Sequence, residues 1–329
     1  MGNRLPLALV RSAIRTTEMV ASHPSEKMKS NRFGINPSRN IHPLERLFKS
    51  LRHRANLLND AWVHGKRPPA VVTYPDLPSR RTALYKVCRA LNWELTNAPR
   101  SNPHLTLRFD DQTKKDTALP AWMSESNRAT WNQGCTDIRK STLERAHQES
   151  FGYGMSVDAL RHVGPMVVKS ELNAQHDGRT IQGPIAAKEQ CTDSVYQIDI
   201  QNVDEEGKYF DYRLVFIRGS ISLAYRKYKS KSTRFTNMCE SACITEVTQA
   251  LSSEELRSTQ QMMNLLHVDY AELDALRDAQ SGKLFVIDVN PTPWGPPAEL
   301  SAEQEVIAIK TMAKAFEQSA ILPTPSRKP

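Results

Sequence analysis

The chain has 329 residues, with 44 Lys or Arg, 36 Asp or Glu and five cysteines. This length allows two domains with a substantial core. No run approaches the roughly 18 apolar residues of a membrane span, so we expect a soluble protein with no membrane partner. The odd number of scattered cysteines argues against a disulfide framework and favours a reducing, cytoplasmic location. The formal charge of +8 is concentrated in residues 1–40, which hold seven Lys or Arg and two Glu. The remainder is nearly neutral, which does not indicate a nucleic-acid partner.

The first third of the chain divides into a leader and a small domain. Residues 1–42 are basic, partly amphipathic and then polar, which is more typical of a mobile N-terminal extension than of a transit peptide. Residues 43–131 predict an α/β domain. Its expected elements are a helix over 43–64, a strand over 70–74, a helix over 79–91 and a strand over 93–96. No glycine-rich fingerprint follows the first strand, so this unit is not expected to bind a dinucleotide.

Residues 132–320 predict a second domain, followed by a tail over 321–329. Its expected elements are a helix over 136–151, strands over 166–169 and 195–200, and a hairpin of 210–217 and 221–228. Ser252 with Glu255 forms a capping box at the start of a helix that runs to about residue 266, and Ser301 starts the last helix. Hairpins dominate this region, so the predicted fold class is α+β.

A hairpin near the C-terminus carries the strongest functional signal. It places Asp274 on its first strand and Asp288 and Asn290 on its second, where residues two apart point to the same face. Hard oxygen ligands suit Mg²⁺, which keeps further positions for water and nucleotide phosphates. Acids on a solvated hairpin are the alternative. The apolar neighbours of Asp288 favour the metal site, because unpaired acids on a buried strand are costly.

Lys169 ends an apolar strand and is suited to reach phosphate oxygens, although a lysine at a strand end is also common on protein surfaces. The loop after it contains His176, Asp177 and Gly178, and its backbone N–H groups are suited to close over phosphates.

Two further strands carry charged side chains. Asp211 and Arg213 share one strand face, which suits an acid on ribose hydroxyls and an arginine on phosphate, or else an intrastrand salt pair. The next strand presents Arg226, Lys227 and Lys229, cations that can stabilise charge on a transferred phosphoryl group.

The order of these motifs resembles the ATP-grasp superfamily, in particular its carboxylate–amine (peptide) ligase branch. The resemblance covers roughly residues 132–293 and implies an ATP-grasp fold with mixed and antiparallel sheets, preceded by a pre-ATP-grasp domain. It implies ATP and Mg²⁺, with Mn²⁺ as an allowed substitute, as cofactors. The implied metal ligands are Asp274, Asp288 and Asn290, and the implied catalytic residues are Arg213 and Arg226. The implied nucleotide-binding residues are Lys140, Lys169, His176, Asp177, Gly178, Gln197, Ile198, Asp199, Ile200 and Asp211.

The chain departs from the family pattern in three places. Gln197 stands where the adenine-contacting strand usually carries a glutamate, and Asp199 lies between apolar neighbours. The phosphate loop is poorer in glycine than is typical, and residues 229–252 have no counterpart in the family.

The resemblance implies an ADP-forming ligase that joins a carboxylate to an amine through an acylphosphate. The substrates would be small molecules or peptides, and the enzyme could be a homodimer. A phosphotransferase on the same scaffold is one alternative. A nucleotide-binding scaffold without chemistry is another. His176 fits either a general base or a polar loop residue.

Overall fold

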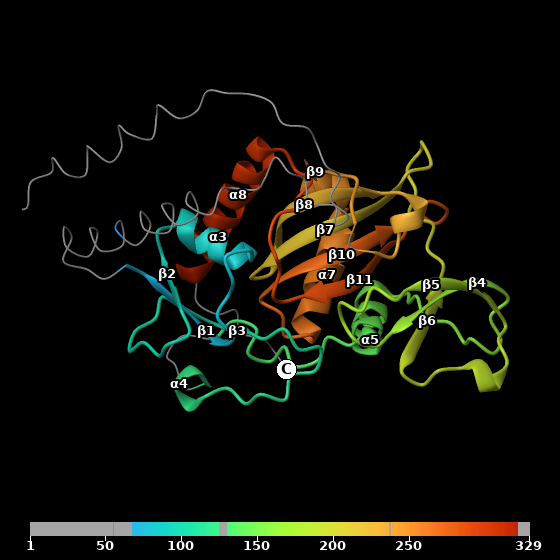
Figure 1. Ribbon diagram of the computed structural model, residues 1–329, viewed down its shortest axis with the longest axis horizontal. Coiled ribbons are helices and arrows are strands. Elements are labelled where there is room, and N and C mark those ends of the chain that lie inside the picture. The colour runs from blue at the N-terminus through green and yellow to red at the C-terminus, as the bar shows by residue number, and fades with distance from the viewer. Residues whose placement is uncertain (1–54, 56–67, 125–129, 237, 322–329) are drawn as a thin grey trace, which may run out of the picture. The chain divides into compact units, whose positions relative to one another are not determined.

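The computed structural model describes Ala55 and residues 68–124, 130–236 and 238–321. The leader predicted over 1–42, the helix predicted over 43–64 except Ala55, and residues 322–329 lie outside this part of the chain. The described residues contain one three-stranded parallel sheet and two antiparallel sheets, together with helices (Figure 1). This is the expected α+β class.

The first sheet belongs to a small α/β unit. Strand β1 (Ala70–Pro75) lies between β2 (Glu94–Thr96) and β3 (Leu105–Phe109), and both neighbours run parallel to it. Helix α3 (Ala83–Ala90) connects β1 to β2, as predicted, and Thr82 caps it by accepting a hydrogen bond from the Tyr85 N–H. A short helix, α4 (Ala121–Ser124), follows β3.

Helix α5 (Lys140–Phe151) leads into the smaller antiparallel sheet, in which β4 (Gly164–Ser170) pairs with β5 (Arg179–Gly183) and β6 (Ser194–Ile198). Gly152 ends α5 in the left-handed conformation, as is common at helix C-termini. Strand β6 ends two residues before the predicted limit, so Asp199 and Ile200 lie in the connection to the next sheet. A 3₁₀ turn, η2 (Ala187–Glu189), precedes β6.

The largest sheet has the strand order β11-β10-β7-β8-β9, and every neighbouring pair is antiparallel. This sheet contains both hairpins predicted from the sequence, which are β7 with β8 and β10 with β11. Arg218 and Gly219 have positive φ in the tight turn between β7 and β8, which is the conformation that two-residue hairpin turns require. The strands are β7 (Tyr209–Ile217), β8 (Ser220–Lys229), β9 (Ser241–Thr245), β10 (Tyr270–Arg277) and β11 (Leu284–Asn290).

Helices cover both faces of this sheet. On one face, Leu214 and Phe216 pack with Met262 of α7 (Ser253–Leu265) and with α5. On the other face, Val215 and Ile217 pack with α8 (Ala302–Ile321) and with the α/β unit. The predicted capping box at Ser252 starts α7. The remaining short elements are η3 (Lys231–Thr233) and α6 (Val247–Ala250).

Alternation along each strand decides on which face of the large sheet a side chain lies. Arg213 lies two residues before Val215 on β7 and therefore shares its face, beyond the apolar contacts with α8. That face thus changes along β7 from apolar to charged, and the candidate site is at its charged end.

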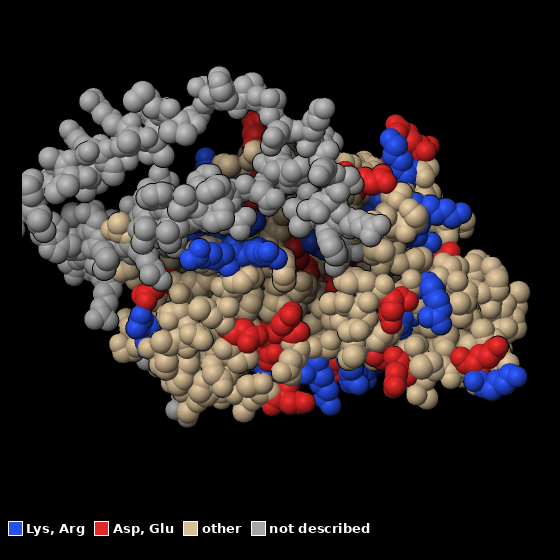
Figure 2. Space-filling model, in the orientation of Figure 1, with Lys and Arg blue, Asp and Glu red and all other residues tan. Residues whose placement is uncertain are grey.

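None of the described helices combines the length and the apolarity that a membrane crossing requires. On the face shown in Figure 2, the acidic and basic side chains of the described residues are interspersed, without one continuous basic patch.

Candidate functional site

Strand pairing brings the predicted metal ligands together. Asp274 of β10 lies opposite Asp288 of β11 on one side and opposite Arg213 of β7 on the other. Asn290 lies opposite Glu272, one alternation further along the same face. The hairpin geometry expected from the sequence is therefore present, and it places Arg213 in the same row of side chains.

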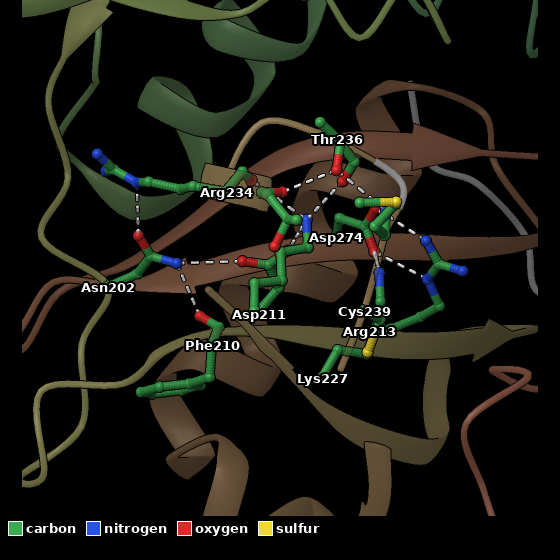
Figure 3. Close-up of polar contacts among 12 residues, drawn as sticks. Asn202, Phe210, Asp211, Arg213, Lys227, Arg234, Thr236, Cys239 and Asp274 are labelled. Carbon is green, nitrogen blue, oxygen red and sulfur yellow. Dashed lines mark hydrogen bonds and ion pairs between the residues drawn. The ribbon is translucent and has the colours of Figure 1, made fainter. Parts of the chain in front are cut away.

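Arg213 binds Asp274 through two parallel hydrogen bonds. The guanidinium donates from Nε at 2.9 Å and from Nη2 at 3.1 Å, and Lys227 Nζ lies 3.8 Å from the same carboxylate (Figure 3). Burial acts to raise the pKa of Asp274, but the charges of Arg213 and Lys227 outweigh it and hold the pKa far below its usual range. Asp274 is therefore ionised at any physiological pH.

Two lysines reach this region from the smaller sheet and its leading helix. Lys140 begins α5, and its ammonium group pairs with the Asp288 carboxylate. Lys169 lies on β4, and burial together with the positive charge of Lys140 lowers its pKa to about 8. No hydrogen bond or ion pair holds the Lys169 amine within the described part of the chain. The site thus contains a cation without a partner, which is an arrangement suited to an anionic ligand.

Glu272 is a further acid at this site that the sequence analysis did not single out. Its carboxylate lies 3.7 Å from the Arg213 guanidinium, and its Oε1 is buried without a hydrogen-bond partner. Burial raises its pKa, while Arg213 acts in the opposite direction. Its position two residues before Asp274 on the same strand is the signal that could have identified it.

Three oxygen-bearing side chains on one face of β10 and β11 fit a divalent cation by their chemistry and by their positions along the paired strands. Two carboxylates and one amide oxygen, from Asp274, Asp288 and Asn290, are hard ligands of the kind that Mg²⁺ takes. Over residues 68–124, 130–236 and 238–321, no three His, Cys, Asp or Glu side chains form a metal-binding group by themselves. Asp274 uses both oxygens for Arg213, whereas Asp288 binds Lys140 through Oδ1, so Asp288 and Asn290 are the better-placed donors.

Asp211 has a different environment from the one predicted. Its carboxylate pairs with Lys229 at 2.6 Å and accepts a hydrogen bond from the Asn202 amide at 3.1 Å, and all three residues are buried. The contact of Asp211 with ribose hydroxyls stays a prediction, and these contacts count against it, because both of its oxygens are engaged inside the protein. The salt-pair alternative was nearer to the structure, although the partner comes from the neighbouring strand.

Asp199 is engaged in the same way. Arg234 Nη1 forms an ion pair with its carboxylate at 2.8 Å. The same guanidinium donates to Asn202 Oδ1 at 3.3 Å (Figure 3) and to the Ile200 carbonyl. We name Asp199, Asn202, Asp211, Lys229 and Arg234 the hinge network, because it joins the connection after β6 to β7, β8 and the loop after β8. The side chain of Asp199 is therefore paired within this network.

Arg226 lies on the face opposite to Arg213. Its guanidinium stacks 3.9 Å from the Phe210 ring centre and lies 3.9 Å from Asp204, while register pairs it with Tyr212. Its role on the transferring group beside Arg213 stays a prediction, and this geometry counts against it. Alternation along β8 brings Lys227 to Asp274 instead.

The predicted phosphate loop connects β4 to β5, beside Lys169. Asp177 accepts a hydrogen bond from the Ser170 N–H at 3.2 Å, and His176 is exposed with a positive φ. Gly178 lies against Phe235, since a Cβ there would approach the ring to 3.1 Å. The turn is thus held at the end of the strand that carries Lys169.

A cavity of about 490 Å³ opens where β6 meets the β10–β11 hairpin. Ile198, Ile200 and Phe285 supply apolar walls, and Asp278 and Lys283 lie at its polar side. The predicted adenine-contacting residues Ile198, Asp199 and Ile200 line this cavity. Gln197 does not line it, because it is buried within the sheet beside β4.

No family model matches the sequence, and no curated protein matches it. Solved structures similar to this chain include the ATP-grasp ligase PsnB complexed with its minimal precursor, at 14% identity and a TM-score of 0.47, covering 77% of this chain and all of that one. They include D-alanine–D-alanine ligase from Bacillus anthracis complexed with ATP, at 11% identity and a TM-score of 0.49, covering 77% and 96%. They also include the VanG D-Ala:D-Ser ligase from Enterococcus faecalis, at 9% identity and a TM-score of 0.45, covering 75% and 100%. With TM-scores below 0.5, these likenesses carry no statement about the reaction of this chain.

Proposed function

We propose that the chain is an ATP- and Mg²⁺-dependent ligase that joins a carboxylate to an amine through an acylphosphate. The observation that carries the proposal is the row of Asp274, Asp288 and Asn290 beside four cations, which are Lys140, Lys169, Arg213 and Lys227. Lys140, Arg213 and Lys227 lie within ion-pair distance of Asp288 or Asp274, whereas Lys169 has no such partner within the described residues, so a bound polyphosphate would supply its counter-charge.

In the proposed reaction, an oxygen of the substrate carboxylate attacks the γ-phosphorus of ATP, and the bond to the β-phosphate oxygen breaks to release ADP. The amine nitrogen then attacks the acyl carbon, phosphate leaves, and the nitrogen loses its proton to solvent or to a basic group. Such transfers need positioning and charge compensation from the protein more than covalent chemistry.

The residues divide this work by position. Lys140 and Lys169 reach the site from the smaller sheet and its leading helix, so they are assigned to the phosphates that leave with ADP. Arg213 and Lys227 come from the large sheet and are assigned to the transferring group, where developing negative charge gains most from fixed cations. The loop of His176, Asp177 and Gly178 closes over the phosphates, and the cavity beside Ile198 accepts the base.

Asp288 and Asn290 would hold Mg²⁺, joined by Asp274 once its bond to Arg213 is shared with the nucleotide. When bound, the ion would neutralise phosphate charge. Before the ion binds, Lys140 holds the Asp288 carboxylate in place, and Arg213 holds the Asp274 carboxylate.

The test is ADP formation in the presence of Mg²⁺ and a library of amino acids, peptides and sugar acids. We expect Asn290→Ala to lower stimulated turnover by at least about 100-fold, since loss of an outer partner alone costs about 10- to 100-fold at metal sites. Asp288→Ala should act in the same direction. Asn264→Ala, at an exposed amide on α7, is the matched control and should retain normal turnover.

Mass spectrometry of the product distinguishes an amide from a phosphorylated acceptor, and therefore a ligase from a phosphotransferase. Near-normal turnover by the Asn290→Ala variant would refute the assignment of the cation site. Tight Mg²⁺–ATP binding with no turnover across the library would favour a scaffold over an enzyme.

A further inference from the structure

The loop after β3 contacts the turn that follows β11. Thr292 is the second residue after the predicted ligand Asn290, and it is 4% exposed. Its Oγ1 lies 2.7 Å from Asp111 Oδ1 and 3.2 Å from Asn290 Oδ1, and its backbone N–H donates to Asn290 Oδ1 at 2.9 Å. Asp111 belongs to the α/β unit, so this contact joins that unit to the proposed cation site.

The hydroxyl of Thr292 has one proton for two acceptors. The charged carboxylate of Asp111 is the stronger acceptor and the nearer one, so the O–H donates there. The Asn290 amide oxygen is then held by the Thr292 N–H, and a carbonyl oxygen has a second lone pair that stays available for a cation. Asp111 thereby fixes the rotamer of Thr292 and the turn that orients the Asn290 oxygen.

The same turn is tied to the α/β unit at a second place. The Ala83 N–H at the start of α3 donates to the Pro293 carbonyl at 3.0 Å. Gly295 has φ of +86°, and a Cβ there would lie 2.8 Å from Ala83 N, so no other residue fits this close approach. The segment after β11 is therefore held against the α/β unit at Thr292 itself and at Pro293 and Gly295 after it.

The loop of Asp111 also reaches the nucleotide side of the site. Thr113 Oγ1 accepts a hydrogen bond from the Asn173 N–H at 2.9 Å, at the start of the phosphate loop. One short loop thus contacts the connection after Lys169 and the turn after Asn290. Asp111 is exposed, so its contact with Thr292 is not part of the core of the α/β unit.

We propose that Asp111, acting through Thr292, is a positioning residue for the cation-binding amide of Asn290. The inference rests on the proposed function, because it assumes that Asn290 binds the metal. Hydrogen-bonded partners that orient a ligand raise metal affinity by holding it in the binding geometry before the ion arrives. The α/β unit therefore contributes to cation affinity without supplying a ligand.

The experiment measures Mn²⁺ binding to the full chain by electron paramagnetic resonance, with and without a non-hydrolysable ATP analogue. We expect Thr292→Val, which keeps the side-chain shape and removes the hydroxyl, to raise the Mn²⁺ Kd about 10-fold. Asp111→Ala should produce a similar increase. Thr292→Ser keeps the hydroxyl and should restore affinity to within about twofold of the unchanged protein. Asp116→Ala, at another exposed acid of the same loop, is the control and should not change the Kd.

The outcomes separate this inference from the function on which it rests. Equal Mn²⁺ affinity in the unchanged protein and in both Thr292→Val and Asp111→Ala would overturn the inference and leave the cation site standing. Absence of Mn²⁺ binding by the unchanged protein would overturn the cation site, and the inference with it. A lower melting temperature of Thr292→Val that Thr292→Ser corrects, with Mn²⁺ affinity unchanged, would assign Thr292 a structural role only and would overturn the inference.

Discussion

The hinge network and the candidate site both include residues of β7 and β8 and use the same kinds of side chain, but their charges are balanced differently. In the hinge network, Lys229 pairs with Asp211 and Arg234 pairs with Asp199. In the candidate site, Arg213 and Lys140 have carboxylate partners, whereas Lys169 has none within the described residues. A buried ion pair that is complete serves the fold, while a partly buried cation without a partner is costly unless a ligand uses it. The comparison therefore separates structural charges from those available for binding.

The largest expected effect tests the paired side of this comparison. Asp211→Ala leaves the Lys229 ammonium buried without its counter-ion, and removing one member of a buried pair typically costs about 3–5 kcal/mol. We expect a loss of that size in the free energy of unfolding, measured by urea denaturation.

The matched change on the unpaired side is Lys169→Met. Burial and the charge of Lys140 both disfavour the Lys169 ammonium, as its pKa of about 8 indicates. Its removal should leave the free energy of unfolding unchanged or higher while ATP binding weakens. If Lys169→Met destabilises the fold as much as Asp211→Ala does, the distinction between the two regions is wrong.

An intermediate effect concerns pH. The pKa of Lys169 in the free protein is about 8, so the amine loses its proton as the pH rises through this value. ATP binds the protonated form more tightly, and its affinity should therefore fall above pH 8 by up to about tenfold per pH unit. Titration calorimetry with a non-hydrolysable analogue between pH 7 and 9.5 would measure it. The charged groups near the amine are Lys140, Asp288, Glu144 and Asp177.

Lys169→Arg provides the control for this titration. A guanidinium stays protonated throughout the range, so the variant should show an affinity that is independent of pH, whatever its absolute value. A slope equal to that of the unchanged protein would show that another group is responsible.

The smallest expected effect is at Arg226, which belongs to neither region. Arg226→Leu removes a partly exposed stacking contact with Phe210, worth about 0.5–1 kcal/mol, and touches nothing in the candidate site. Stimulated ATP turnover should stay within about twofold of normal, because this side chain contacts Phe210, Tyr228 and Asp204 rather than the cations of the candidate site. A 100-fold loss would restore the catalytic role expected from the sequence.

Local pattern alone was enough for several features. Strand alternation placed Asp288 and Asn290 on one face, and the spacing of Ser252 and Glu255 predicted the start of α7. The two hairpins of the large sheet and the βαβ order of the first unit were also predictable. Each of these features depends on residues close together in the chain, where steric and hydrogen-bonding preferences act directly.

Which charges pair with which was decided by the tertiary structure. Asp211 and Arg213 lie two residues apart and share a strand face. Asp211 nevertheless pairs with Lys229, whereas Arg213 pairs with Asp274. Strand β8 carries three cations, Arg226, Lys227 and Lys229. The register of β8 against β7 determined which of them lie on the same face as Arg213. Asp111 and Thr292 lie far apart in the sequence, and no local pattern joins them. Electrostatic partners depend on distance and burial in three dimensions. The sequence by itself therefore determined on which strand face each charged residue lies, and the tertiary structure determined which ion pairs these residues form.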